Sequence, residues 1–317
     1  MSQVWVLHDG KQGMRSQVLG LAEALALPFV EKRLVVRAPW RHLMPSLWVQ
    51  PLKALSAEGD LLTPPWPDVI ISCGRNTVAP ARAVKAANRG HTLWVHIQDP
   101  RAGRQDVDLM VVPEHDRTRG ENVILTRGAV HRVTPAKLAE GRKTFAPTFA
   151  DLPRPLVSVL LGGNNKVYRL TLERLGQVAD DLVKISKRGY GLAITPSRRT
   201  GEAGLALLRE KLAGRRAFIW DGTGENPYFG LLGLADAILV TGDSVSMVSE
   251  AGATGKPVHV IELEGGSTKF RRFHDMMEKA GVTRPFRGQV EQWSYPPLND
   301  TAKAAAIIRD MLLKRAA

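Results

Sequence analysis

Three short segments of the sequence combine glycine, hydroxyl, amide and arginine residues in the manner of anion-binding loops. Backbone N–H groups at a glycine turn, side-chain hydroxyls and the fork of an arginine all suit phosphate oxygens. One such segment alone is adequately explained by ordinary turns and helix caps, but three in one half of the chain indicate a phosphate site. The residues we assign to it are Gly162, Gly163, Asn164 and Asn165 in the first segment, Ser197, Arg198, Arg199 and Thr200 in the second, and Asp243, Ser244 and Ser246 in the third.

Short apolar runs alternate with amphipathic helical patterns along the chain, and this alternation positions the three segments. The runs at residues 4–7, 69–73, 156–161 and 237–240 predict buried strands, each followed by a glycine-bearing loop and a helix. Such alternation is typical of a parallel sheet covered on both faces. Ligands of these sheets bind beyond the carboxyl ends of the strands, which is where the three segments are expected.

A proline-rich stretch at residues 143–155 separates two runs of this pattern and is typical of a linker. We therefore predict an α/β protein with two Rossmann-like doubly wound domains. The N-terminal domain would occupy residues 1–148, and the C-terminal domain, which carries the three segments, residues 149–290. Residues 291–317 would form a C-terminal segment whose helix can pack back on the first domain.

The composition sets limits on the class of protein. With 44% hydrophobic and 24% charged residues among 317, the chain is globular, and its single cysteine excludes a disulfide framework. No secretory signal or long apolar run is present, so we expect a cytoplasmic protein. The net charge of +13 is spread over both halves, which argues against a nucleic-acid arm and suits anionic substrates or an anionic membrane surface.

Three familiar sites are not supported by the residues. The stretch Gly252-Ala253-Thr254-Gly255-Lys256 is too short for a phosphate-binding Walker loop, and Pro257 stands where serine or threonine is required. A Gly-x-Gly-x-x-Gly fingerprint is absent, so a nicotinamide or flavin site is not expected. The histidines lack ligand spacing, and we predict no metal.

Residues 217–257 resemble the nucleotide-binding half of GT-B glycosyltransferases, in particular the transferase that adds N-acetylglucosamine to the peptidoglycan lipid precursor. Nearly the whole chain looks like the bacterial relatives of the plant mitochondrial-fission protein family. The phrases that carry this second resemblance include Asp9-Gly10-Lys11-Gln12-Gly13, Gln98-Asp99-Pro100-Arg101 and Asp243-Ser244-Val245-Ser246-Met247. Both resemblances imply the GT-B architecture, in which two Rossmann-like domains face each other across a cleft.

The GT-B resemblance also assigns roles to single residues. Glu250 matches the acidic residue that accepts hydrogen bonds from ribose hydroxyls, a task for which a carboxylate offers acceptors to both donors; an exposed helix glutamate is the alternative. Ser244 or Ser246 would hold the diphosphate. Trp220 and Asn226 lie where the family reads the base, and Lys269 where it contacts the sugar or phosphates. The implied donor is a UDP- or GDP-sugar, and no cofactor is required.

The acceptor side needs a general base that takes the proton of the acceptor hydroxyl. Asp9 and His8 follow the first predicted strand, and Asp99 follows the strand that ends at residue 97. Asp9 is the first candidate and His8 the second. A turn role for Asp9 is equally consistent with the sequence, because Asp-Gly is a common turn pair.

Residues 38–53 mix Trp, Leu and Met with basic side chains. This composition suits a segment that lies in a membrane interface, and in the similar transferases such a patch docks on the bilayer. A core helix with an irregular entry loop is the alternative. The first interpretation predicts that the protein is peripherally bound to a membrane, through contact with the anionic inner face of the cytoplasmic membrane.

Together these observations predict a metal-independent glycosyltransferase that moves a sugar from a nucleotide-diphosphate donor to a lipid-linked or envelope-glycan acceptor. Two other functions fit the same fold. One is a non-catalytic membrane-remodelling adaptor, as the plant family name implies, and the other is a nucleotide-sugar epimerase. The sequence does not name the sugar, the nucleotide or the acceptor.

Overall fold

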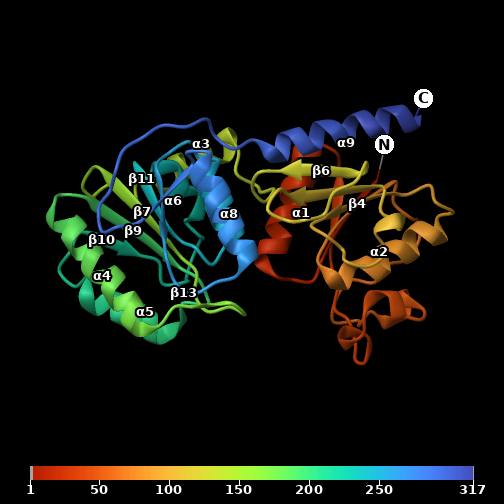
Figure 1. Cartoon of the computed structure of the whole chain (residues 1–317), viewed down its shortest axis with the longest axis horizontal. Coiled ribbons are helices and arrows are strands. Elements are labelled where there is room, and N and C mark those ends of the chain that lie inside the picture. The colour runs from red at the N-terminus through yellow and green to blue at the C-terminus, as the bar shows by residue number, and fades with distance from the viewer. Residues whose placement is uncertain (1–2, 317) are drawn as a thin grey trace. The chain divides into compact units, whose positions relative to one another are not determined.

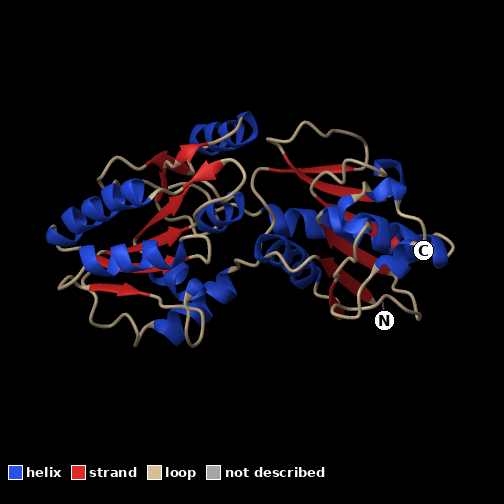
Figure 2. Cartoon of the chain, turned by 90° about the horizontal axis from the view of Figure 1, so that it is seen from below, coloured by secondary structure: helices blue, strands red, loops and turns tan. Residues whose placement is uncertain are grey.

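The computed structural model describes residues 3–316, and they form two compact units. The first unit runs to Arg132 and takes up the chain again at Asn299, whereas the second spans Val133–Leu298. Each unit is a parallel six-stranded sheet with helices on both faces (Figures 1 and 2). The predicted α/β class with two doubly wound sheets is confirmed.

The sheet of the first unit has the strand order β2-β1-β3-β4-β5-β6. The strands are β1 (Val4–His8), β2 (Phe29–Arg33), β3 (Val69–Cys73), β4 (Leu93–Ile97), β5 (Leu109–Pro113) and β6 (Val123–Thr126). Helices α1 (Gln12–Leu25) and α9 (Asp300–Ala316) share one apolar core on one face of this sheet. Helix α2 (Arg75–Ala87) covers the other face. The strand order reverses between β1 and β3, which is where such folds bind ligands.

The sheet of the second unit has the order β10-β9-β7-β11-β12-β14. The strands are β7 (Leu156–Leu161), β9 (Gly191–Pro196), β10 (Ala217–Ile219), β11 (Ala237–Thr241), β12 (Val258–Ile261) and β14 (Thr283–Pro285). The helices are α3 (Pro135–Phe145), α4 (Leu172–Lys187), α5 (Gly201–Lys211), α6 (Tyr228–Leu234), α7 (Val245–Gly252) and α8 (Thr268–Lys279). A small antiparallel pair joins β8 (Tyr168–Arg169) to β13 (Glu264–Gly265). This order is that of a dinucleotide-binding Rossmann sheet, and its reversal lies between β7 and β11.

Continuous burial explains why the central strands read as unbroken apolar runs. Every residue of β1, β3 and β4 is buried in the first unit, and every residue of β7 and β11 in the second. Helices on both faces exclude water from both sides of a parallel sheet, so the sequence cannot alternate between apolar and polar residues.

The boundary between the units lies after Arg132 rather than after residue 148 as predicted. Helix α3 belongs to the second unit because it packs closely on α6: a Cβ at Gly141 would meet the backbone carbon of Phe229 at 2.5 Å. The predicted linker continues this packing, since Phe149 is buried in the core of the second unit. The proline-rich composition therefore marks a tightly packed turn.

The C-terminal segment divides between the units. Leu298 donates its backbone N–H to the carbonyl of Gly252 at 3.2 Å and is buried in the core of the second unit. From Asn299 onward the chain belongs to the first unit, where α9 packs on α1 and the Thr301 hydroxyl accepts a hydrogen bond from the His131 N–H at 2.9 Å.

Residues 38–53 do not form a core helix. They contain the short 3-10 turns η1 (Trp40–His42), η2 (Pro45–Leu47) and the start of η3 (Pro51–Ala54). The Trp48 side chain is buried in the core under α2 and anchors the segment. The apolar side chains between the turns remain in contact with solvent: Leu43, Met44, Leu47 and Val49 are 38%, 56%, 62% and 74% exposed.

Candidate functional site

The loops after β7 and β11 meet at the reversal point of the second sheet. The Gly162 N–H donates to the Thr241 hydroxyl at 2.7 Å, and the Gly163 N–H donates to Oδ2 of Asp243 at 3.2 Å. Ligands of doubly wound sheets bind at this position because the loops on either side of it diverge there. Two of the three segments that the sequence singled out are therefore hydrogen-bonded to each other.

The third segment joins them through an ion pair with a buried carboxylate. The guanidinium of Arg199 lies with Nη1 at 2.5 Å from Oδ2 of Asp243 and at 3.3 Å from the carbonyl of Gly163. The Asp243 side chain is fully buried, and its Oδ1 has no hydrogen-bond partner within residues 3–316. Arg199 thus neutralises a buried carboxylate while part of its side chain stays exposed.

Ser197 and Thr200 hold the glycine turn in place. Both hydroxyls donate to the carbonyl of Gly162 at 2.7 Å, and Oγ1 of Thr200 also accepts from the Ser197 N–H at 3.0 Å. Arg198, in contrast, is exposed. The hydroxyls that the sequence assigned to phosphate oxygens therefore fix the backbone of the loop, whereas Arg198 extends into solvent.

The two asparagines after the glycine pair shape the same loop. Oδ1 of Asn165 accepts from the N–H groups of Val167 and Tyr168, both at 2.8 Å, and its Nδ2 donates to the carbonyl of Asp243 at 3.2 Å. Oδ1 of Asn164 accepts from the Leu170 N–H at 2.8 Å. These bonds satisfy backbone groups that leave the strand, so the amides organise the loop itself.

Helix α7 begins at this point with Ser244 as its N-cap. The Ser244 hydroxyl accepts from the Met247 N–H at 3.3 Å, as N-cap residues do. A hydroxyl that accepts in this way can still donate its own hydrogen. Ser246 lies half-buried in the first turn of the helix. Both serines thus stand at a helix N-terminus, where backbone N–H groups favour an anion.

Glu250 is buried and hydrogen-bonded to a residue that the sequence analysis did not select. Its side chain lies at the end of α7 with 7% of its surface exposed, and its Oε2 accepts from the Tyr228 hydroxyl at 2.5 Å. Burial and the negative charge of Glu250 raise the pKa of Tyr228, so the phenol stays protonated and donates. Asn226, which is exposed, accepts through Oδ1 from the Tyr228 N–H at 3.0 Å in the turn before α6.

The remaining donor-side candidates lie on other elements. Trp220 follows the outer strand β10, is half-buried, and donates through Nε1 to the carbonyl of Thr223 at 3.0 Å. Lys269 is exposed in the first turn of α8. The structure therefore links the three phosphate-type segments directly, links Asn226 to Glu250 through Tyr228, and leaves Trp220 and Lys269 as separate predictions.

Helix α8 contributes a histidine that sequence reasoning missed. Nε2 of His274 lies 2.8 Å from the carbonyl of Gly242, and its Nδ1 is buried without a hydrogen-bond partner in the described part of the chain. Burial lowers the pKa of His274, which favours the neutral ring. A cavity of about 350 Å³ lies beside it, lined among others by Gly242, Glu262, Arg271 and Asp275. Only the tertiary contact with Gly242 distinguishes this histidine from others on an amphipathic helix.

In the first unit, Asp9 lies at the reversal point of the sheet. It follows β1, and a Cβ at Gly74, which follows β3, would lie 4.0 Å from the Asp9 carboxyl carbon. Asp9 also pairs with the ammonium of Lys11 through Oδ2. The carboxylate is therefore at the position where the fold binds ligands, with a cation beside it.

His8 is locked by its neighbours. Its Nδ1 accepts from the Gly10 N–H at 3.0 Å, which leaves the ring proton on Nε2, and Nε2 lies 2.8 Å from Glu31. The side chain is only 2% exposed. With both nitrogens occupied and the ring buried, His8 supports the loop and is poorly placed to take a proton from a substrate.

Asp99 is held in a similar way in the loop after β4. Burial by itself raises the pKa of Asp99, but hydrogen bonds from Arg104, the Arg101 N–H and Thr118 outweigh it and lower the pKa to about 2. So weak a base is unsuited to proton abstraction. The same loop holds Gln98 and Arg101 at positive φ of 74° and 63°, a conformation that non-glycine residues adopt at a cost.

Two kinds of feature are absent from residues 3–316. No group of three or more His, Cys, Asp or Glu side chains in this part of the chain could hold a metal ion. No helix there is both long and apolar enough to cross a membrane.

The fold and the site at its reversal point define the class of protein: a GT-B-like protein of two Rossmann units. UDP-GlcNAc 2-epimerase of Methanocaldococcus jannaschii superposes with a TM-score of 0.60 at 14% identity, covering 99% of this chain and 100% of that one. MurG of Acinetobacter baumannii superposes with a TM-score of 0.50 at 12% identity, covering 100% and 92%. At such identities the likeness concerns the fold alone.

The chain belongs to the family described as Mitochondrial fission ELM1, whose sequence model matches residues 12–312. Mitochondrial fission protein ELM1 of Arabidopsis thaliana is 33% identical over 276 residues, which cover 78% of this chain but 65% of the plant protein. The protein RP120 of Rickettsia prowazekii is 24% identical across 96% of this chain and 97% of that protein. The predicted resemblance to the fission family is confirmed.

Proposed function

We propose that the second unit binds a nucleoside-diphosphate sugar and that the protein is a metal-independent glycosyltransferase. The observation that carries this proposal is the convergence of Gly162-Gly163, Arg199 and the N-terminus of α7 at the reversal point of a Rossmann sheet. Backbone N–H groups and hydroxyls there suit a diphosphate. As the leaving group departs, the helix N-terminus and the exposed part of Arg199 would stabilise its charge.

The buried carboxylate of Glu250 supports a nucleotide rather than inorganic phosphate. It lies in the last turn of α7, and its Oε2 already accepts from Tyr228. A ribose diol would donate to the same carboxylate, because each carboxylate oxygen accepts more than one hydrogen bond. In two structures with the same fold, the proteins hold UDP-GlcNAc (Neisseria meningitidis epimerase) and UDP (S. aureus MnaA). UDP-GlcNAc is therefore the first donor to test.

Asp9 is the general base of this proposal. Both ring nitrogens of His8 are engaged, and the pKa of Asp99 is about 2. Asp9 is also paired, with Lys11, but it lies at the reversal point of the sheet, where the fold binds ligands, so we assign the role to Asp9. It would accept the proton of the acceptor hydroxyl while the sugar is transferred to the oxygen.

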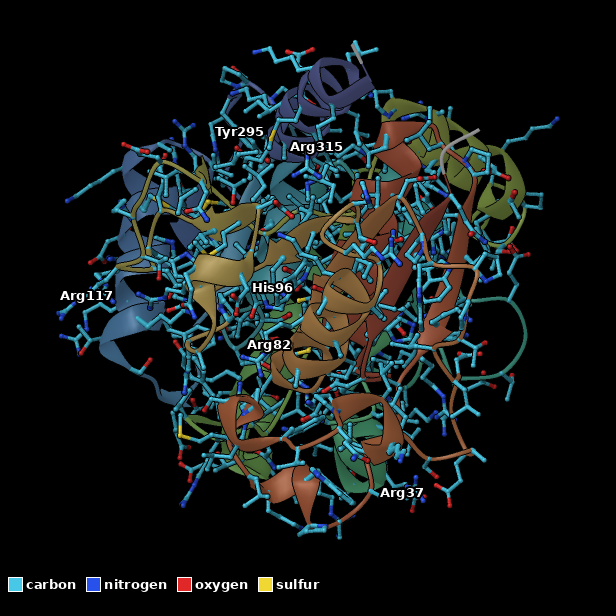
Figure 3. All side chains as sticks on the ribbon, turned by 90° about the vertical axis from the view of Figure 1, so that its right-hand side faces the viewer. Arg37, Arg82, His96, Arg117, Tyr295 and Arg315 are labelled. Atoms are coloured by element: carbon cyan, nitrogen blue, oxygen red, sulfur yellow. The ribbon has the colours of Figure 1, made fainter. Side chains whose placement is uncertain are left out.

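A lipid-linked acceptor is favoured by the exposed tip of the first unit. Leu43, Met44, Leu47 and Val49 are exposed there, and a rim of exposed basic side chains surrounds them: Arg37, Arg41, Lys53 and Arg75. The guanidinium of Arg75 donates to the carbonyl of Leu43 at 2.6 Å and stabilises the turn. Figure 3 shows Arg37 low in the view, beside this tip, and Arg82 above the tip on α2. Apolar side chains ringed by cations suit an anionic bilayer surface.

Binding of a nucleoside-diphosphate panel, followed by the melting temperature, tests the donor site. UDP or GDP should raise the melting temperature, since a ligand that binds only the folded state stabilises it. If none of UDP, GDP, ADP and CDP does so, the donor site is wrong. Incubation with UDP-GlcNAc alone tests for an epimerase, because an epimerase would change the sugar without an acceptor. The Glu250→Ala variant tests for an adaptor, because an adaptor would keep its function without this carboxylate.

Sedimentation with vesicles tests the membrane contact. The protein should bind vesicles that contain anionic lipid, and Leu47→Glu with Val49→Glu should abolish the binding while the protein stays folded. Leu172→Glu is the matched control, because Leu172 is 53% exposed in the second unit and outside the tip. Equal binding by both variants would overturn the assignment.

A further inference from the structure

Strand β6 forms an unprotected edge of the first unit's sheet. It pairs with β5 on one side, and no strand within residues 3–316 lies on its other side. Residues 122–126 read Asn-Val-Ile-Leu-Thr and carry no charge. The opposite edge strand, β2, carries Glu31, Lys32 and Arg33. Proteins usually protect sheet edges with charges of this kind. The uncharged edge of β6 is therefore available for pairing with another strand.

A groove runs along this edge beneath α9. Its volume is about 720 Å³, and its apolar lining includes Val123, Ile124 and Leu125 of the strand with Ile307 and Met311 of the helix. Leu125 and Ile307 are 40% and 42% exposed. Arg315, labelled in Figure 3, donates to Oδ1 of Asp108 at 2.9 Å and so fastens the end of α9 to the start of β5. The contact between Arg315 and Asp108 therefore fixes the position of α9 beside the groove, and the groove has room for an added strand.

The backbone of β6 determines which groups face the groove. Asn122 and Thr126 direct their carbonyls at β5, where they accept from Met110 and Glu114, both at 2.7 Å. Because a strand alternates, Val123 and Leu125 direct their backbone groups outward. The Val123 N–H donates to the Gly120 carbonyl at 3.2 Å in a turn. The Leu125 N–H and the two carbonyls are the outward groups that a partner strand can use without changing the monomer.

We propose that β6 pairs antiparallel with β6 of a second copy of this chain, centred on Ile124. In this register Val123 faces Leu125 of the second copy, and the Leu125 N–H of each chain donates to the Val123 carbonyl of the other. Directly opposed residues that face outward form the hydrogen-bonded pairs of an antiparallel ladder. The pairing continues each sheet into the other and buries the apolar groove.

The charges next to the strand are complementary in this register, at both ends of the paired strands. Glu121 faces Arg127 of the second copy, and the two-fold axis repeats the pair. Both side chains are exposed in the single chain. Two ion pairs thus flank the Val–Leu contacts on one face, while Ile124 meets its own copy on the other face. This self-complementary pattern of charges is the reason to propose a second copy as the occupant. This inference is independent of the proposed function.

The mass of the full chain in solution tests the pairing. Sedimentation should give a monomer–dimer equilibrium, and Leu125→Pro should abolish the dimer, because it removes the outward N–H but no bond to β5. Glu121→Arg and Arg127→Glu should each weaken the dimer roughly tenfold or more, since like charges then face each other twice.

Mixing the two charge variants decides the register. In the mixed dimer the two substituted side chains, at positions 121 and 127, carry opposite charges and face each other at one end. At the other end the native Arg127 of one variant faces the native Glu121 of the other. Association should therefore return in the mixture although each variant alone dimerises weakly.

Circular dichroism confirms that each variant is folded. A native chain that stays monomeric at all concentrations, single variants that dimerise like the native chain, or a mixture that does not associate would each overturn the proposal.

Discussion

Arg199 and Asp243 form an ion pair that joins two loops of the second unit, with Nη1 and Oδ2 2.5 Å apart. The Asp243 side chain is fully buried, whereas 39% of the Arg199 side chain is exposed. Because the Gly163 N–H donates to the same carboxylate oxygen, the pair also fixes the glycine turn after β7. The geometry of the proposed diphosphate site therefore depends on a contact between residues that are far apart in the sequence.

Asp243→Asn should lower the free energy of unfolding by about 1–3 kcal/mol. The variant keeps the size of the side chain but removes the charge that Arg199 neutralises. The loss stays below that of a fully buried pair because water can still reach Arg199. Urea denaturation measures it, with Arg198→Ala as the control, since Arg198 is the exposed neighbour of Arg199. Equal stability of the two variants would contradict the role of the pair.

Gly163→Ala should destabilise the second unit by about 2 kcal/mol or more, because overpacking displaces the neighbouring backbone. A Cβ at Gly163 would lie 2.2 Å from the carbonyl oxygen of Arg199. Gly176→Ala is the matched control: its Cβ would meet only Leu207 Cδ2, at 4.0 Å, within α4. That variant should be stabilised by roughly 0.5–1 kcal/mol. Thermal unfolding of both distinguishes close packing from a general intolerance of glycine replacement.

Glu250→Gln should weaken the binding of nucleoside diphosphates about tenfold or more, which corresponds to about 1.4 kcal/mol. The amide keeps the size of the side chain and an oxygen for the Tyr228 hydroxyl, but it replaces an acceptor for the ribose diol by a donor. Titration calorimetry with UDP measures the change. Pyrophosphate lacks the ribose and should bind both forms equally, so a parallel loss of pyrophosphate binding would place the effect outside the ribose contact.

Protonation of Asp99 should lower the free energy of unfolding as the solution is acidified from about pH 4 to about pH 2. Burial alone would raise the pKa of Asp99, but the hydrogen bonds from Arg104, Arg101 and Thr118 outweigh burial and lower it to about 2, against an ordinary value of 3.8. A lowered folded-state pKa stabilises the protein above the unfolded-state value, and that stability is lost as the pH falls through the folded-state value.

The difference in unfolding free energy between the native chain and Asp99→Asn measures this contribution at each pH. It should be constant above about pH 4 and should shrink below it. Arg104→Gln removes the main donors and should shift the change to higher pH. A difference that does not vary between pH 2 and pH 5 would show that the Asp99 carboxylate is not stabilised in the folded chain.

The sequence by itself determined the class of fold and the place where we propose the donor site. Parallel strands buried on both faces must be nearly continuous in apolar residues, so β1, β3, β7 and β11 were recognisable from composition alone. The glycine and hydroxyl residues of the site follow these strands directly, and their position along the chain fixes the edge of the sheet where they lie.

Only the tertiary structure decided what those residues contact. Ser197 and Thr200 donate to Gly162, Arg199 neutralises Asp243, and Tyr228 donates to Glu250, all between elements that are distant in sequence. The sequence also did not predict the boundary after Arg132 or the exposure of Leu47 and Val49, because both depend on which surfaces pack together. Local patterns encode backbone conformation and average burial, whereas the pairing of two side chains is set by the path of the chain between them.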